Sequence, residues 1–112
     1  MTEKETGRIE PAVALELVEL VQYAEGAVVS RTIVDRQQGT LTLFAFDEEQ
    51  GLSEHSTPFA AYVIMLDGEA DIIIGGEPIP ARAGQIVLMP AGVPHSVRAN
   101  GRFKMLLAMI RA

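Results

Sequence analysis

The chain has 112 residues, no cysteine and a formal net charge of −6, which allows one domain with a buried core and leaves too little chain for a second. The lack of cysteine excludes disulfides and thiolate metal sites, and the acidic balance disfavours nucleic acid, because binding to phosphates needs a concentrated basic face. The N-terminal stretch lacks the apolar core of a signal peptide and no apolar run is long enough to cross a bilayer, so we expect a cytoplasmic protein without a membrane partner.

Residues 1–9 are polar and predict a flexible N-terminus, which leaves residues 10–112 as the single domain. From Glu10 to Tyr23 a helical stripe and a strand alternation both fit the apolar positions, and we favour a short strand followed by a helical turn. Residues 1–56 hold eleven of the fifteen carboxylates. This concentration indicates a solvated acidic surface rather than an acidic docking tail.

From Gly26 onward the sequence consists of short β-type segments separated by turn signals. Residues 27–34 and 40–46 are rich in Val, Ile, Thr and Leu, and the polar turn between them predicts a hairpin at Arg36–Gly39. We expect the chain to reverse again at each of the later turn signals: Asp67-Gly68, Gly75-Gly76, Gly84, Ala91-Gly92 and Asn100-Gly101. Turns at this regular spacing predict an all-β sandwich or barrel.

Several of the predicted strands are apolar on both faces, notably residues 62–66, 72–74 and 105–110. One face of a strand in a small antiparallel barrel normally meets water, so something must cover the outer face of these strands. A symmetric homodimer would cover it, and so would the N-terminal segment of the same chain. We favour the homodimer, because closed symmetric pairs are common among soluble proteins.

The stretch from Gly84 to His95 joins a buried strand to a stiff turn. Residues 86–89 form a short apolar run, and Pro90 ends its hydrogen-bond ladder because proline has no N–H group. Gly92 permits positive φ in the reversal, and Pro94 biases the preceding residue toward extended geometry. His95 is therefore expected to begin the next strand in a fixed position.

The spacing of Gly84, Pro90, Gly92 and His95, G-x5-P-x-G-x2-H, resembles the second motif of the cupin family. Members of that family are small β-barrels of the jelly-roll class. The resemblance implies an all-β fold, a double-stranded antiparallel β-barrel, with a pocket inside the barrel.

The family's first motif, G-x5-H-x-H-x3/4-E-x6-G, can be laid on residues 51–68 with several departures. His55 falls on the first histidine, whereas Thr57 stands at the second and Ala61 at the glutamate. The resemblance implies that His55 and His95, the only two histidines of the chain, point into the barrel from neighbouring strands. The implied ligand pocket is lined by six residues: His55, Thr57, Ala61, Met65, Met89 and His95.

Strand alternation adds Leu41, Leu43 and Val97 to this lining, and such a lining favours a small, largely apolar or aromatic ligand. The family's usual metal site resembles three histidines and one glutamate around an Fe, Mn, Ni, Cu or Zn ion. This chain offers only His55 and His95, which would leave a divalent ion mostly ligated by water. We therefore expect either no cofactor or a weakly held divalent transition metal (Zn, Ni, Fe or Mn) on these two histidines.

The leading hypothesis is a small-molecule-binding cupin domain with a degenerate metal site. The alternative is a metal-dependent cupin enzyme of the dioxygenase or isomerase type, with His55 and His95 as metal ligands. The sequence contains no nucleophile elbow and no phosphate-binding glycine loop. Whether a reaction is catalysed, and by which residues, is left open at this stage.

Overall fold

The structure is a computed structural model that describes the backbone of residues 2–6 and 8–111 and the side chains of residues 8–111. These residues form eight strands and one short 3-10 helix, as the alternation of β-branched and turn residues predicts. The elements are β1 (Thr2–Thr6), η1 (Leu17–Glu19), β2 (Val28–Arg36), β3 (Gly39–Phe46), β4 (Gly51–His55), β5 (Ala61–Ile74), β6 (Glu77–Arg82), β7 (Ile86–Met89) and β8 (His95–Ile110).

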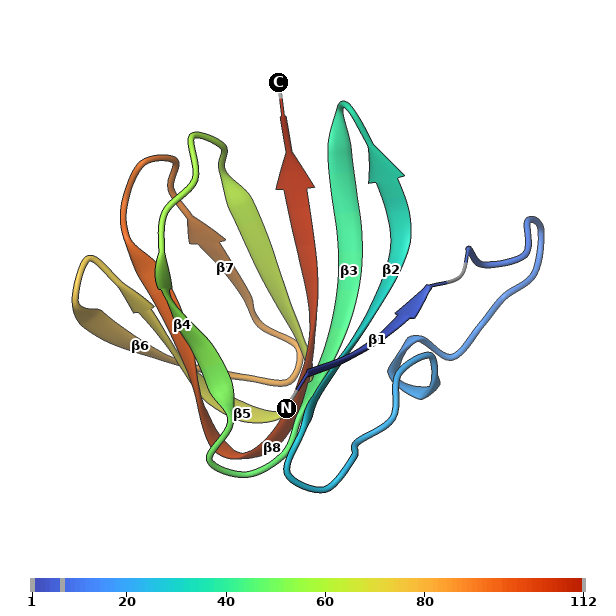
Figure 1. Ribbon diagram of the computed structural model, residues 1–112, viewed down its shortest axis with the longest axis horizontal. Helices are drawn as coiled ribbons and strands as arrows, with labels where there is room; N and C mark the ends of the chain where they lie inside the picture. The colour runs from blue at the N-terminus through green and yellow to red at the C-terminus, as the bar shows by residue number, and fades with distance from the viewer. Residues whose placement is uncertain (1, 7, 112) are drawn as a thin grey trace.

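The strands form one curved sheet in the order β1-β2-β3-β8-β5-β6, with β4 paired to β8 and β7 paired to β5. The β1–β2 pairing is parallel and the other pairings are antiparallel. Figure 1 shows β4 and β6 on one side of a common interior and β2 and β3 on the other. The pairings place β7 in the layer of β2 and β3, next to the first half of β5, while β4 and β6 pair with the first half of β8 and the second half of β5. The prediction of an all-β antiparallel barrel of jelly-roll type is confirmed.

The two longest strands, β5 and β8, continue past two positions at which the sequence predicts that the chain reverses. The expected turns at Asp67-Gly68 and Asn100-Gly101 are wrong, because both glycines lie inside continuous strands at φ of +73° and +101°. The β5–β8 register shifts on both sides of Gly68, which is typical of β-bulges. These glycines bend the two neighbouring strands together, so that one pair of strands contributes to both sides of the barrel.

The reversals predicted at Arg36–Gly39 and Gly75-Gly76 are confirmed as the β2–β3 and β5–β6 hairpins. The expected strand within residues 10–23 is wrong, because the only regular element there is the 3-10 helix Leu17–Glu19. The polar N-terminus, expected to be flexible, contains strand β1, which pairs with the first half of β2. No helix among the residues that the structure describes is long and apolar enough to cross a membrane.

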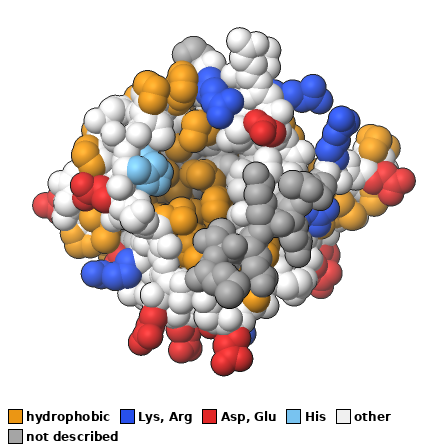
Figure 2. Space-filling model, in the orientation of Figure 1, with side chains coloured by type: hydrophobic (Ala, Val, Ile, Leu, Met, Phe, Trp, Pro, Cys, Tyr) orange, Lys and Arg blue, Asp and Glu red, His pale blue; other side chains and the backbone are white. Residues whose placement is uncertain are grey.

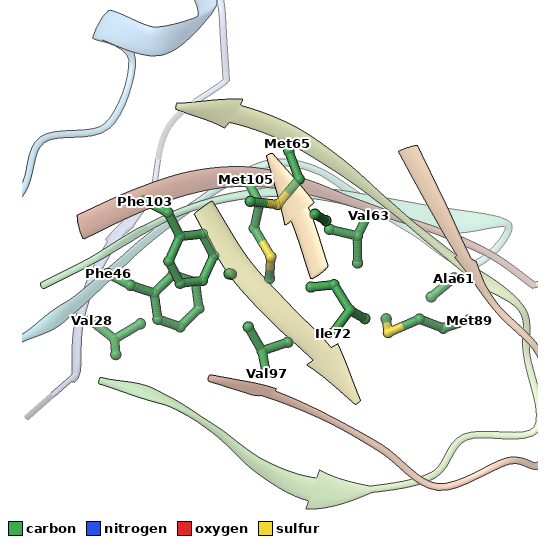
Figure 3. Close-up of a cluster of buried hydrophobic side chains, with 12 residues drawn as sticks. Val28, Phe46, Ala61, Val63, Met65, Ile72, Met89, Val97, Phe103 and Met105 are labelled. Carbon is green, nitrogen blue, oxygen red and sulfur yellow. The ribbon is translucent and has the colours of Figure 1, made fainter. Parts of the chain in front are cut away.

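One apolar cluster, drawn from most of the strands, lies in the barrel interior. Figure 3 shows its side chains converging between the two sides of the barrel, with the rings of Phe46 and Phe103 face to face. These two rings stack at a centroid distance of 4.3 Å and an interplanar angle of 6°. The fully buried members of the cluster include Phe46, Val63, Met65, Ile72, Phe103 and Met105.

A second apolar cluster lies on the outer face of the sheet, where residues 18–24, here called the strap, cross β2 and β3. Val21 of the strap is 1% exposed and packs with Leu43 and Ala45 of β3. The Lys104 amine donates a hydrogen bond of 2.6 Å to the Val18 carbonyl, and the Tyr23 hydroxyl donates one of 2.6 Å to Asp67. The chain's own N-terminal segment therefore covers part of the outer face.

Candidate functional site

The two histidines of the chain meet where β4 ends and β8 begins. His55 is the last residue of β4, His95 is the first of β8, and the two are register partners in the antiparallel pairing. Their Nε2 atoms lie 3.2 Å apart, and the rings meet edge to face with centroids 4.4 Å apart. Figure 2 shows the histidine surface at the rim of a hollow whose floor is hydrophobic.

The turn before His95 is held by backbone hydrogen bonds to two neighbouring loops. Strand β7 ends at Met89, and Gly92 then adopts φ of +77°, a conformation that glycine tolerates better than other residues. The Gly92 N–H donates to the Thr57 carbonyl at 2.7 Å, and the Gly75 N–H donates to the Pro94 carbonyl at 2.8 Å. The stiff turn that the sequence predicts is thus held by hydrogen bonds at both Gly92 and Pro94.

The hydrogen bonds of the histidine pair determine which nitrogen of each neutral ring carries the hydrogen. The Ser53 carbonyl can only accept, so Nδ1 of His55, 2.9 Å away, carries a hydrogen and Nε2 of His55 is left as an acceptor. Nε2 of His95 then donates to it. This assignment leaves Nδ1 of His95 as a bare acceptor, and that buried atom has no hydrogen-bond partner among the described residues.

The two rings differ in their surroundings. His95 is 5% exposed, whereas His55 is exposed. Burial of the ring lowers the pKa of His95, and the charge of His55 lowers it further. The Val93 backbone raises this pKa, although it does not reach hydrogen-bond geometry at Nδ1. The buried ring is therefore neutral near pH 7, which is the form that accepts a hydrogen bond or binds a metal ion.

The other residues predicted for the pocket lie in different surroundings. Ala61, Met65 and Met89 are buried in the interior cluster, on strands β5 and β7. Thr57 is half-buried in the loop after β4, where its hydroxyl donates to the Phe59 carbonyl at 2.7 Å and accepts from the Phe59 N–H at 3.1 Å. The Thr57 hydroxyl is thus used within its own loop.

The expectation that Leu41 and Leu43 line the interior is wrong, because both pack in the outer cluster. The alternate residues of β3 face inward instead, including Phe44 and Phe46. Sequence reasoning also missed Ile74, the register partner of His95 in β5, which packs against the interior cluster. The two aromatic residues of β3 were the available signal for its inward face.

The geometry of the histidine pair can be compared with that of two ligands of one metal ion. Bonds of about 2.0–2.1 Å to Zn, at angles between octahedral and tetrahedral, separate two imidazole nitrogens by about 2.8–3.4 Å. The observed 3.2 Å falls in this range, and the contact of His55 Nδ1 with a carbonyl is the usual outer contact of a ligating histidine. Among the described residues no group of three or more His, Cys, Asp or Glu side chains could hold a metal. The pair therefore fits two positions of a metal's coordination shell once the hydrogen on Nε2 of His95 has moved to Nδ1.

Three solved structures resemble the chain over most of its length. A conserved protein of unknown function from Streptococcus pyogenes is 38% identical at a TM-score of 0.90, over 95% of this chain and 93% of that one. A cupin 2 conserved barrel domain protein from Leptotrichia buccalis is 34% identical at a TM-score of 0.84, over 87% of this chain and 47% of that one. A cupin superfamily protein from Desulfitobacterium hafniense is 25% identical at a TM-score of 0.87, over 93% and 95% of the two chains.

No curated protein matches the chain. The family model described as "Cupin domain" matches residues 42–110, which include both histidines and the whole barrel from β4 to β8. This match covers more than half of the sequence and agrees with the barrel architecture and with the motif from Gly84 to His95. The chain belongs to the cupin domain family.

Proposed function

We propose that this chain is a small-molecule-binding cupin domain whose ligand enters the mouth of the barrel and hydrogen-bonds the imidazoles of His55 and His95. The observation that carries the proposal is the placement of a buried, neutral imidazole against an exposed one at the rim of an apolar interior. Ligand sites are commonly concave and apolar with a few polar groups that fix orientation. The two Nε2 atoms, which bond each other in the free site, would exchange this hydrogen bond for bonds to the polar group of the ligand.

The lining limits the chemistry of the ligand. The interior cluster described above consists of aliphatic, aromatic and methionine side chains, with Phe44, Ile74 and Leu107 partly buried against it. A charged ligand body would lose its hydration there without gaining an ion-pair partner. The proposed ligand is therefore a small molecule with a largely apolar or aromatic body and one polar group for the imidazoles.

The second candidate is a metal-dependent cupin enzyme of the dioxygenase or isomerase type, favoured by the 3.2 Å between the two Nε2 atoms. His55 and His95 would hold a divalent transition ion, which would supply Lewis acidity to a substrate oxygen. The Ser53 carbonyl orients the His55 ring through Nδ1, and the apolar interior excludes water from one side of the site. Because the chain offers two protein ligands in this geometry, the other coordination positions would be open to water and substrate.

Metal content measured by mass spectrometry distinguishes the two candidates. Untagged protein from cells grown with mixed transition metals is compared with the His55→Ala/His95→Ala double variant. Glu54→Ala is the matched control, since Glu54 is an exposed neighbour of His55 outside the pair. We expect far less than one ion per chain, unchanged in either variant. Near one ion per chain, lost only in the double variant, would favour the enzyme.

Binding itself is tested by thermal shift with a library of small aromatic and aliphatic compounds that carry one polar group. A ligand at the proposed site raises the Tm of the wild type and of Glu54→Ala and leaves the double variant unshifted. The stabilisation grows with ligand concentration, by about 2.7 kcal/mol at a hundred times the Kd. A compound that stabilises all three proteins equally binds elsewhere and contradicts the proposed site.

A further inference from the structure

Two threonine hydroxyls lie on the inward face of the barrel wall that β2 and β3 form. Thr32 and Thr42 are register partners, and their Oγ1 atoms lie 3.3 Å apart. Thr42 stands between Leu41 and Leu43, which pack in the outer cluster, so by strand alternation it shares the inward face of Phe44. These two threonine side chains are here called the hydroxyl pair.

The hydroxyl pair interrupts a row of side chains that is otherwise apolar. The pairings continue this row across three more strands, through Leu107 of β8, Val63 of β5 and Val87 of β7. Each of these apolar side chains belongs to the interior cluster or packs against it. Valine has nearly the shape of threonine and a similar preference for strands. Packing alone therefore does not require the hydroxyls of Thr32 and Thr42.

The hydroxyl pair has more hydrogen-bonding capacity than it uses. Each hydroxyl has one hydrogen to donate and two lone pairs to accept with, and the contact between Thr32 and Thr42 uses one hydrogen. No other side-chain hydrogen bond joins either threonine to a residue that the structure describes. Both residues are half-buried although they face inward. One hydroxyl hydrogen is thus left to donate on the interior side of the wall.

The hydroxyl pair and the histidine pair lie at the same height on facing walls of the barrel. Strand β8 bends at Gly101 and contributes to both walls. Its inward residues are Ala99, Val97 and His95 counted from the bend toward one end, and Phe103, Met105 and Leu107 counted toward the other. Leu107, in the row of His95 by this count, is the register partner of Thr42. Figure 1 shows β4, which ends at His55, across the interior from β3.

The surface between the two polar pairs is apolar. Phe44 and Leu107 on one wall and Ile74 on the other are partly buried against the interior cluster. Ile74 is the register partner of His95, and Phe44 lies one row deeper than Thr42. Facing sheets pack about 10 Å apart, so one small molecule that lies on this apolar surface can contact both walls.

We propose that the hydroxyl pair is a second polar contact for the ligand, opposite the imidazoles. This inference rests on the proposed function and extends it, because the ligand then carries a second polar group at the end of its apolar body remote from the histidines. Hydroxyls are uncharged and both donate and accept, and a charged group would lose its hydration there without an ion-pair partner. The second group is therefore neutral, such as a hydroxyl, a carbonyl or an amide.

Two matched compounds test the role of Thr32 and Thr42. The compound para-hydroxybenzyl alcohol has a polar group at each end of its ring, whereas para-methylbenzyl alcohol has a methyl group in place of the phenol hydroxyl. The chain has two histidines, so NMR titration of protein with isotope-labelled histidine gives each Kd and reports whether the compound binds at the imidazoles. In the Thr32→Val/Thr42→Val variant we expect the ratio of the two Kd values to change about 3- to 10-fold against the two-ended compound.

Ser96→Ala is the matched control, because Ser96 is next to His95 but lies on the opposite face of β8. It should keep the wild-type ratio, and circular dichroism reports whether each variant is folded. An equal ratio in the wild type and the threonine variant, with histidine signals that respond in both, overturns the inference and leaves the proposed function standing. If neither compound moves the histidine signals of the wild type, the result contradicts the proposed function and this inference together.

Discussion

Gly68 and Gly92 share a backbone conformation but differ in what surrounds them, and this difference predicts unequal effects of the same substitution. Their φ values are +73° and +77°. A Cβ on Gly68 would overlap the Arg102 carbonyl and crowd Phe103, whereas a Cβ on Gly92 would meet nothing within 4 Å. Gly92→Ala therefore costs about 1–2 kcal/mol from the left-handed backbone alone, and Gly68→Ala adds about 1–3 kcal/mol of overpacking.

Denaturant unfolding of the two alanine variants measures both effects, and Gly92→Asn is the control because asparagine tolerates positive φ. That variant should be more stable than Gly92→Ala. Equal losses for Gly68→Ala and Gly92→Ala would contradict the close approach of β5 and β8 at Gly68. At Gly92 the loss concerns the turn that positions His95, so it should also weaken ligand binding.

The strap illustrates how a segment with little regular structure is held by specific side chains. Burial and the hydrogen bond to Asp67 raise the pKa of Tyr23, so the phenol stays protonated and continues to donate at neutral pH. The Lys104 amine lies 4.9 Å from the centre of the Tyr23 ring while it bonds the Val18 carbonyl. These contacts join the strap to β5 and β8, the two strands that form the middle of the sheet.

Removing the Tyr23 hydroxyl should weaken the attachment of the strap but leave its apolar contacts in place. Tyr23→Phe is expected to lower the free energy of unfolding by about 1 kcal/mol and to speed proteolytic cleavage within the strap, residues 18–24. Tyr62→Phe is the matched control, because no hydrogen bond of its hydroxyl to a described residue is present. Cleavage at the same rate in Tyr23→Phe and wild type would mean that the hydroxyl does not hold the strap.

At the level of strands, the sequence predicted most elements and misplaced two reversals for a physical reason. Asp67-Gly68 and Asn100-Gly101 signal a residue with positive φ, and both a hairpin turn and a β-bulge use that conformation. The choice depends on the neighbouring strand, here the pairing of Gly68 with Phe103. Gly75-Gly76 does not lie inside a strand that is paired with neighbouring strands on both sides, and the chain reverses there as predicted.

At the scale of the whole molecule, the position of His95 could be predicted from the sequence better than the residues that line the barrel interior. The motif from Gly84 to His95 predicted where β8 begins and which residue opens it, because each step follows from local backbone chemistry. The inward face of β3 was misread because Leu41 and Leu43 on one face and Phe44 and Phe46 on the other are all apolar. Alternation then cannot tell inside from outside, and only the strap, distant in sequence, decides it.

The acid stability of the whole barrel depends on a carboxylate that joins three distant parts of the chain. Asp47 follows β3, accepts a 2.6 Å hydrogen bond from the Gly26 N–H before β2, and forms a 2.7 Å ion pair with Arg102 in the bend of β8. The Gly26 N–H, followed by the Arg102 guanidinium, lowers the pKa of Asp47 to about 2. The folded state therefore favours the charged carboxylate more than the unfolded chain does.

A lowered folded-state pKa gives stability that is fully present above the unfolded value near 4 and is lost as the pH falls toward 2. Asp47→Asn should be less stable than the wild type at pH 7, and the difference should shrink between pH 4 and pH 2 as the carboxylate of the unfolded wild-type chain becomes protonated. Denaturant unfolding at pH 7, 4, 3 and 2 measures this, with the exposed Asp35→Asn as the control. A difference that stays constant down to pH 2 would mean that Asp47 acts through its shape and not through its charge.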